Sequence, residues 1–173
     1  MLGSTTPAPA AIAPAETLPL ITDFLTSIGL RIEYGEVPDD TFLPAVQVIQ
    51  NGLRVDRAKL KHPGDLLHEG GHLAAMSRAE REQPVPIVSP DGGDEMLAIA
   101  WSYAAAVHLG LPPEVVFHAD GYRGGSESLV ENFTAGRPLG VPMLQYRGLS
   151  YESRLAAEHG VPAYPHMVRW LRE

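Results

Sequence analysis

The chain has 173 residues, a length that suits one domain with a substantial buried core. Hydrophobic residues make up 45% and charged residues 20%, a balance typical of globular proteins and not of disordered or fibrous ones. The formal net charge of -8, with Lys and Arg scattered along the chain, disfavours nucleic acid as a partner, and the absence of cysteine excludes disulfides and thiolate metal sites.

The opening residues are rich in Ala, Pro and Thr and contain neither Lys nor Arg, so they lack the charged segment of a signal peptide. We interpret residues 1–16 as a disordered tail and residues 17–173 as a single domain. No apolar run approaches the roughly 18 residues that cross a bilayer, so the sequence predicts no membrane association and a cytoplasmic location.

A first amphipathic helix is expected at residues 17–28, where apolar side chains recur with helical spacing before a glycine. Three strands should follow, at residues 30–34, 45–49 and 53–55. The dipeptide Asn51-Gly52 lies between the last two and is a strong signal for a hairpin turn.

A second helix is expected to begin near Pro63 and to continue to about Glu80. After a loop at residues 84–90, the Asp91-Gly92-Gly93-Asp94 cluster should cap a long helix that continues through Leu109. Shorter helices are expected at residues 112–118, 127–133, 151–159 and 164–171, with a Gly-rich loop at residues 120–126. This order predicts an α+β fold with a small, mostly antiparallel sheet.

The segment His68-Glu69-Gly70-Gly71-His72 lies within the second predicted helix and matches the pattern H-E-x-x-H. Because positions i and i+4 of a helix lie on one face, both imidazoles can bind one metal ion. A solvated surface could give the same pattern by chance, but Leu66, Leu67 and Leu73 make this helix too apolar for that. Zinc suits such nitrogen ligands, and catalytic zinc uses three protein ligands, so a third is required.

Glu69 lies one step round the helix from His68 and is poorly placed to ligate beside both histidines. Its carboxylate can instead accept a proton from a water molecule that the zinc ion activates. We therefore predict Glu69 as the general base of a hydrolytic reaction, with amide hydrolysis as the default chemistry.

The motif and the order of elements over residues 30–109 resemble those of the zincin metallopeptidases. The metzincin branch would require Gly at position 75 and His at position 78, and Ala75 and Arg78 exclude it. The gluzincin branch takes its third ligand as a Glu from the following helix. This resemblance implies that Glu95 is the third zinc ligand.

Helix geometry favours this assignment, because the face that carries Glu95 consists mostly of small residues that allow close helix approach. Gly70 and Gly71 each cost about 1 kcal/mol relative to Ala in a helix interior, so we expect another backbone to pack there. Glu95 could instead be a carboxylate favoured by the helix dipole, and Asp91 or Asp94 could supply the ligand.

A zincin also needs a donor that stabilises the oxyanion. Tyr103 shares the face of Glu95 two turns later, although an aromatic on an Ala-rich helix is more often a core residue. His118, Tyr122 and Arg123 flank the Gly-rich loop and are the other candidates. By the same resemblance, the substrate would lie along one of the strands between residues 45 and 55.

Together these features predict a zinc-dependent metallopeptidase that acts on a peptide or protein, in which a partner protein could supply specificity. One alternative is a zincin-fold sensor or interaction module that keeps the metal without cleaving anything, although an intact Glu69 argues against it. Another is a zinc hydrolase of non-peptide amides or esters, because the same machinery activates water for both.

Overall fold

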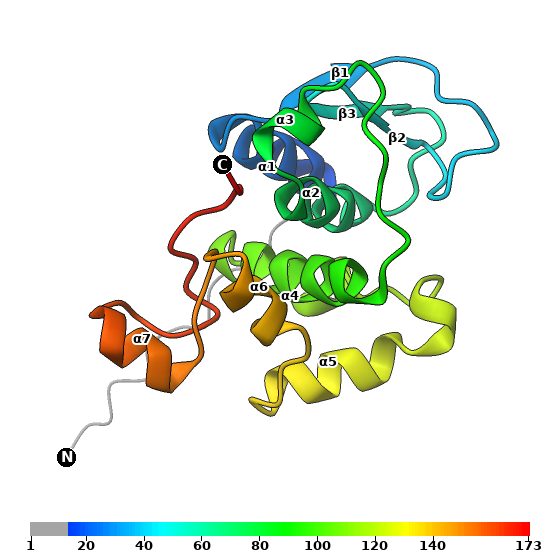
Figure 1. The fold of residues 1–173 in the computed structure, drawn as a ribbon. Helices are drawn as coiled ribbons and strands as arrows, with labels where there is room; N and C mark the ends of the chain where they lie inside the picture. The colour runs from blue at the N-terminus through cyan, green and yellow to red at the C-terminus, as the bar shows by residue number, and fades with distance from the viewer. Residues whose placement is uncertain (1–13) are drawn as a thin grey trace.

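The computed structural model describes residues 14–173. Residues 1–13 of the expected tail lie outside the described residues, and Pro14–Glu16 form the start of the first helix. The described part is an α+β fold of seven α-helices and one small sheet, stacked in layers (Figure 1). Helix α1 (Pro14–Ser27) and the sheet pack on one side of α2 (Asp65–Ala75), and α4 (Gly92–His108) packs on the other.

The sheet contains β1 (Arg31–Tyr34), β2 (Val46–Ile49) and β3 (Gly52–Val55) in the order β1-β3-β2. Strand β2 is antiparallel to β3, whereas β1 is parallel to it, so the sheet is mixed and not mostly antiparallel as expected. The chain between β1 and β2 returns across the sheet, which brings β1 beside β3 in the same direction.

The hairpin turn lies one residue earlier than expected. The register pairs Ile49 with Gly52, so Gln50 and Asn51 occupy the turn, and Asn51 adopts a positive φ of 51°. Gly52 belongs to β3, where an added Cβ atom would lie 1.9 Å from the carbonyl oxygen of Arg31. This glycine is required by the close approach of β1 and not by the turn.

Helix α2 ends at Ala75, five residues before the expected end near Glu80, because Met76 is extended with ψ 144°. A separate short helix, α3 (Arg78–Arg81), begins there with a capping box. The Ser77 side chain accepts from the Glu80 backbone N–H, and the Glu80 carboxylate accepts from the Ser77 backbone N–H. These reciprocal bonds start a new helix at the position where a continuous one was expected.

Helix α4 follows the predicted bounds closely. Asp91 is its N-cap, and the Asp91 carboxylate accepts a hydrogen bond of 2.7 Å from the Gly93 backbone N–H. The fully buried Trp101 packs against Phe24 of α1 and against Trp170, whose carbonyl oxygen accepts from the indole N–H. Across residues 14–173, no helix has both the length and the apolar character needed to cross a bilayer.

The second half of the chain differs more from expectation. The expected helix at 112–118 is a 3₁₀ turn, η1 (Pro113–Val115), and α6 (Val141–Tyr146) was not expected. Helices α5 (Ser126–Thr134) and α7 (Ser153–His159) lie near their predicted positions. Residues 164–171 form no helix, because their backbone groups bond elsewhere: the Tyr164 N–H donates to Tyr151, and the Val168 N–H donates to Leu149.

The end of the described chain is fastened to the carboxyl end of α2 through a buried arginine. Arg81, 4% exposed, donates from one guanidinium nitrogen to the carbonyl oxygens of Met76 at 2.6 Å and of Arg172 at 2.7 Å. The Arg172 backbone N–H in turn donates to Ala74. These bonds satisfy carbonyl groups that the last turn of α2 leaves without partners inside the helix.

Candidate metal centre

Helices α2 and α4 approach closely because two glycines face the contact. An added Cβ atom on Gly71 would lie 2.7 Å from the Ala98 Cα atom, and one on Gly70 would lie 3.1 Å from the Trp101 ring. The expectation that another backbone packs against these glycines is confirmed for Gly71, whereas a Cβ atom on Gly70 would meet the side chains of Leu25 and Trp101. This close packing brings the first turn of α4 opposite the middle of α2, where the two histidines lie.

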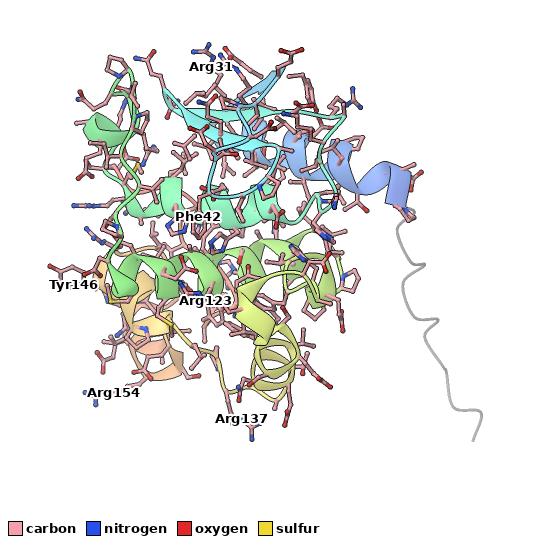
Figure 2. All side chains as sticks on the ribbon, turned by 90° about the vertical axis from the view of Figure 1, so that its right-hand side faces the viewer. Arg31, Phe42, Arg123, Arg137, Tyr146 and Arg154 are labelled. Atoms are coloured by element: carbon pink, nitrogen blue, oxygen red, sulfur yellow. The ribbon has the colours of Figure 1, made fainter. Side chains whose placement is uncertain are left out.

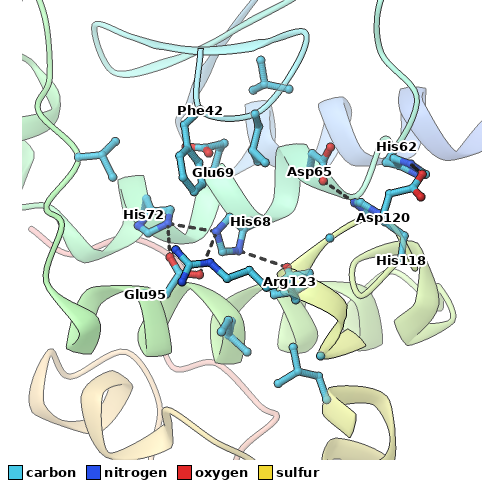
Figure 3. A pocket seen from close by; sticks show the side chains of 18 of the residues that line it. Phe42, His62, Asp65, His68, Glu69, His72, Glu95, His118, Asp120 and Arg123 are labelled. Atoms are coloured by element: carbon cyan, nitrogen blue, oxygen red, sulfur yellow. Dashed lines mark hydrogen bonds and ion pairs between the residues drawn. The ribbon is translucent and has the colours of Figure 1, made fainter. Parts of the chain in front are cut away.

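Three side chains converge in the space between these helices. The Nε2 atoms of His68 and His72 lie 3.1 Å apart, and the Glu95 carboxylate oxygens lie 3.6 Å and 3.1 Å from them respectively (Figure 3). Zinc–ligand bonds of about 2.0–2.1 Å in a tetrahedral arrangement separate neighbouring donor atoms by about 3.3 Å. The spacing of these donors therefore fits a small tetrahedral cation.

The electrostatics of the cluster also favour a cation. His68 and His72 are each about 5% exposed, whereas Glu95 is half-buried. Hydrogen bonds from the two histidines hold the pKa of the Glu95 carboxyl well below its usual range. Burial alone would lower the pKa of His72, but its hydrogen bond to Glu95 and the charge of Glu69 raise it above its ordinary value. The same negative charges that stabilise a proton on His72 would stabilise a divalent cation bound at this position.

Glu69 lies beside this cluster as a buried carboxylate at the wall of the cleft, 6% exposed. Burial raises its pKa against the opposing charges of His72 and His68. Within residues 14–173, no side chain or backbone group forms a hydrogen bond or ion pair with its carboxylate. A desolvated carboxylate without a partner is poised to accept a proton.

The other two carboxylates considered as the third ligand have separate partners. Asp91 caps α4 through the Gly93 N–H, and Asp94 forms an ion pair of 3.2 Å with Arg147. Only Glu95, of these three carboxylates, groups with His68 and His72.

Tyr103 is not among the residues that line the cleft. Its ring packs against Phe133 at 4.6 Å between centroids and also contacts Phe117 and Tyr164. It shares a helix face with Glu95, but eight residues along an α-helix amount to about 12 Å. The expected role of Tyr103 above the metal is therefore withdrawn in favour of a core role.

The remaining oxyanion candidates lie on one loop but in different places. The Tyr122 hydroxyl lies 3.3 Å from Nδ1 of His68, and the His118 Nε2 atom lies 2.8 Å from the Asp65 carboxylate. Arg123 is exposed and lines the cleft, where it extends toward the donor cluster (Figure 3).

A second pair of histidines, His62 and His118, lies at another part of the cleft and was not expected from the sequence. The rings of His62 and His118 are stacked at 3.7 Å and 6°, and the Asp120 carboxylate lies 2.8 Å from His62 Nε2. Parallel rings do not direct their nitrogen lone pairs at one point, so we interpret this group as a stack held by two carboxylates. No local sequence signal could have revealed it, because His62 and Asp120 are 58 residues apart.

The donor cluster lies on a cleft of about 1460 Å³. Strand β2 and the loop before it form one wall, and residues around η2 (Tyr122–Gly124) form another. Figure 2 shows Phe42 over α2 and Arg123 over α4 on the same face of the molecule. Phe42 is 84% exposed and contributes an apolar side chain to the rim.

Comparison of the chain with protein-family models, with curated proteins and with solved structures gave no match. Its function must therefore be inferred from the site.

Proposed function

We propose that the protein is a zinc-dependent hydrolase that cleaves peptide bonds, with an active-site plan like that of the gluzincin metallopeptidases. The observation that carries this proposal is the convergence of His68, His72 and Glu95 beside Glu69, a buried carboxylate without a partner. Three ligands, with a base beside them, are what a catalytic zinc site requires.

The donor set supports zinc over calcium and magnesium. Two imidazole nitrogens and one carboxylate suit zinc, whereas calcium and magnesium prefer oxygen ligands in larger number or with several waters. Glu95 is partly exposed, and all three ligands line the cleft, so a fourth position would face solvent. When bound, zinc would supply Lewis-acid activation of a water molecule and of a substrate carbonyl group.

The residues of the chain would then carry the proton transfers. Glu69 would accept a proton from the attacking water and deliver it to the amine that leaves when the C–N bond breaks. Burial favours both steps, because it raises the pKa of Glu69 toward the range where a carboxyl can give a proton back. His68 and His72 are fixed on α2, so their orientation relative to Glu69 is set by one rigid helix.

An extended peptide is the substrate that the cleft fits best. Strand β2 is an edge strand, and Val46 and Val48 line the cleft. In an antiparallel pair, every second residue of a strand bonds to the neighbouring strand. Ala45 bonds to Asp56, next to β3, so the backbone groups of Val48, an odd number of residues further along, point away from β3 toward the open edge. A substrate could pair with this edge by main-chain hydrogen bonds.

Zinc content and hydrolysis of quenched fluorescent peptides test this proposal together. Wild type should retain close to one zinc per chain and cleave peptides, whereas Glu69→Gln should retain zinc and lose cleavage. Glu127→Gln, an exposed carboxylate on α5, is the matched control and should behave as wild type. Full activity of Glu69→Gln would refute the assigned base, and a wild type that cannot be loaded with zinc would refute the metal centre.

A further inference from the structure

Tyr122 contacts a proposed zinc ligand from outside the donor cluster. Its hydroxyl lies 3.3 Å from Nδ1 of His68, and the two rings meet edge to face, with centroids 5.6 Å apart at 88°. The tyrosine comes from η2, 54 residues after the histidine. Its ring also packs edge to face on Phe117, so the phenol is held on two sides.

The position of the phenol suits an outer-shell partner of a metal ligand. Nε2 of His68 faces His72 and Glu95, and Nδ1 lies on the other side of the imidazole ring. If Nε2 binds a cation, the proton of the neutral ring resides on Nδ1. The group next to Nδ1 must then accept a hydrogen bond. A phenol oxygen can accept such a hydrogen bond, and the Tyr122 hydroxyl is the group that lies within reach of Nδ1.

The loop that carries Tyr122 is tied to the metal-binding helix. The Asp65 carboxylate lies 2.8 Å from His118 Nε2, with both side chains 12% exposed, and Asp65 precedes His68 on α2 by one turn. The Ser126 hydroxyl donates to the His118 carbonyl oxygen at 2.5 Å and closes the loop on itself. Helix α2 therefore carries His68 and also, through Asp65, holds the loop that contacts His68.

The backbone at this point is strained. Tyr122 and Arg123 have φ of 54° and 52°, a left-handed conformation that costs a non-glycine residue about 1–2 kcal/mol. Such a conformation persists only where the surroundings enforce it. The contact between His118 and Asp65 and the packing of Tyr122 on Phe117 are the contacts that can do so here.

We propose that Tyr122 is a positioning residue that orients His68 for metal binding by accepting a hydrogen bond from Nδ1, and that the Asp65–His118 pair holds Tyr122 in place. The inference rests on the proposed metal centre. It differs from the oxyanion role considered for Tyr122, because the phenol lies behind the imidazole ring and away from the three donor atoms.

Metal affinity without substrate tests this role. Zinc affinity of the full chain is measured by competition with a chromogenic chelator, and the absorption spectrum of the cobalt-loaded protein reports ligand geometry. Tyr122→Phe keeps the ring packing and should weaken zinc binding by roughly 10- to 100-fold, as loss of an outer-shell partner does. It should also alter the cobalt spectrum. Tyr146→Phe, 79% exposed on α6, is the matched control and should change neither.

A double-mutant cycle tests the link to Asp65. Asp65→Asn alone should weaken zinc binding, and in the Tyr122→Phe background it should cause little further loss, because both changes act on one hydrogen bond. Additive losses would overturn the link.

Unchanged zinc affinity in Tyr122→Phe, with or without a loss of kcat, would overturn the positioning role, and a loss of kcat alone would identify a contact to the substrate. Failure of wild type to bind either ion would refute the metal centre itself, an outcome distinct from a loss confined to the variant. A further outcome is that the chain binds a second equivalent of zinc, which is lost in His62→Ala. That result would identify the stack of His62 and His118 as a metal site and would overturn the role of His118 in holding the loop.

Discussion

Gly71 of α2 and Ala98 of α4 meet backbone to backbone: a Cβ atom on Gly71 would lie 2.7 Å from the Ala98 Cα atom and 2.8 Å from its carbonyl oxygen. Backbone atoms cannot move aside as a flexible side chain can, so Gly71→Ala must push the helices apart. We expect a loss of stability of about 1–3 kcal/mol from overpacking, despite the better helix propensity of Ala. Urea unfolding measures the loss.

Gly92→Ala is the matched control for this change. Gly92 is also helical, but no atom lies within 4 Å of the position that its Cβ would occupy. This variant should be as stable as wild type or slightly more stable. If both variants unfold alike, close helix approach is not the reason for the glycine at position 71.

Glu95→Gln should weaken zinc binding by more than the roughly 10- to 100-fold expected for an outer-shell partner, because it removes a charged ligand from between two histidines. Asp94→Asn breaks the ion pair to Arg147 and should leave zinc affinity unchanged. The chelator competition described above measures both. If Asp94→Asn lowers zinc affinity as much as Glu95→Gln does, then the negative charge at the start of α4, and not ligation by Glu95, controls zinc binding.

Glu69→Gln should stabilise the metal-free protein near neutral pH. Burial raises the pKa of Glu69, so above that raised pKa the folded wild type buries a negative charge that water solvates in the unfolded chain. Removing the charge should add about 1–3 kcal/mol of stability. As pH falls, Glu69 becomes neutral in both states and the advantage should vanish. Urea unfolding across pH, with metal removed by a chelator, gives the difference, and a constant difference would contradict this explanation.

The Ser77–Glu80 capping box should give a pH dependence of the opposite sign. Hydrogen bonds from the Ser77 side chain and backbone N–H lower the pKa of Glu80 below 4.5. Its carboxylate therefore contributes stability above its ordinary pKa, and this contribution is lost as pH falls through the lowered value. Ser77→Ala should move the Glu80 pKa upward in an NMR titration and cost about 0.5–2 kcal/mol. An unchanged Glu80 pKa in that variant would refute the reciprocal bonding.

Local sequence signals predicted the parts of the fold that local interactions determine. Asp91 before a long apolar pattern marked the start of α4, and helical spacing placed His68 and His72 on one face. The break after α2 had a local signal too, the Ser77–Glu80 pair, which the expectation of one continuous helix to about Glu80 did not take into account.

The parts that depend on distant contacts could not be predicted in this way. The helical rise alone places Tyr103 about 12 Å along the axis from Glu95, too far for a role at the metal, but the sequence did not show that its ring would pack against Phe133. Tyr122 lies beside His68 and His118 beside Asp65 across 54 and 53 residues of sequence, separations that no local pattern covers. The parallel placement of β1 likewise depends on how a loop crosses the sheet, which strand propensity does not specify.

The bonds from Arg81 to Met76 and to Arg172, 91 residues further along, make the carboxyl end of α2 part of a very long-range contact. Closing so large a loop has an entropic cost that only cooperative packing offsets. The last turn of α2 and the segment around Arg172 should therefore open together, as one unit, and their amide hydrogens should exchange with solvent with the same opening free energy.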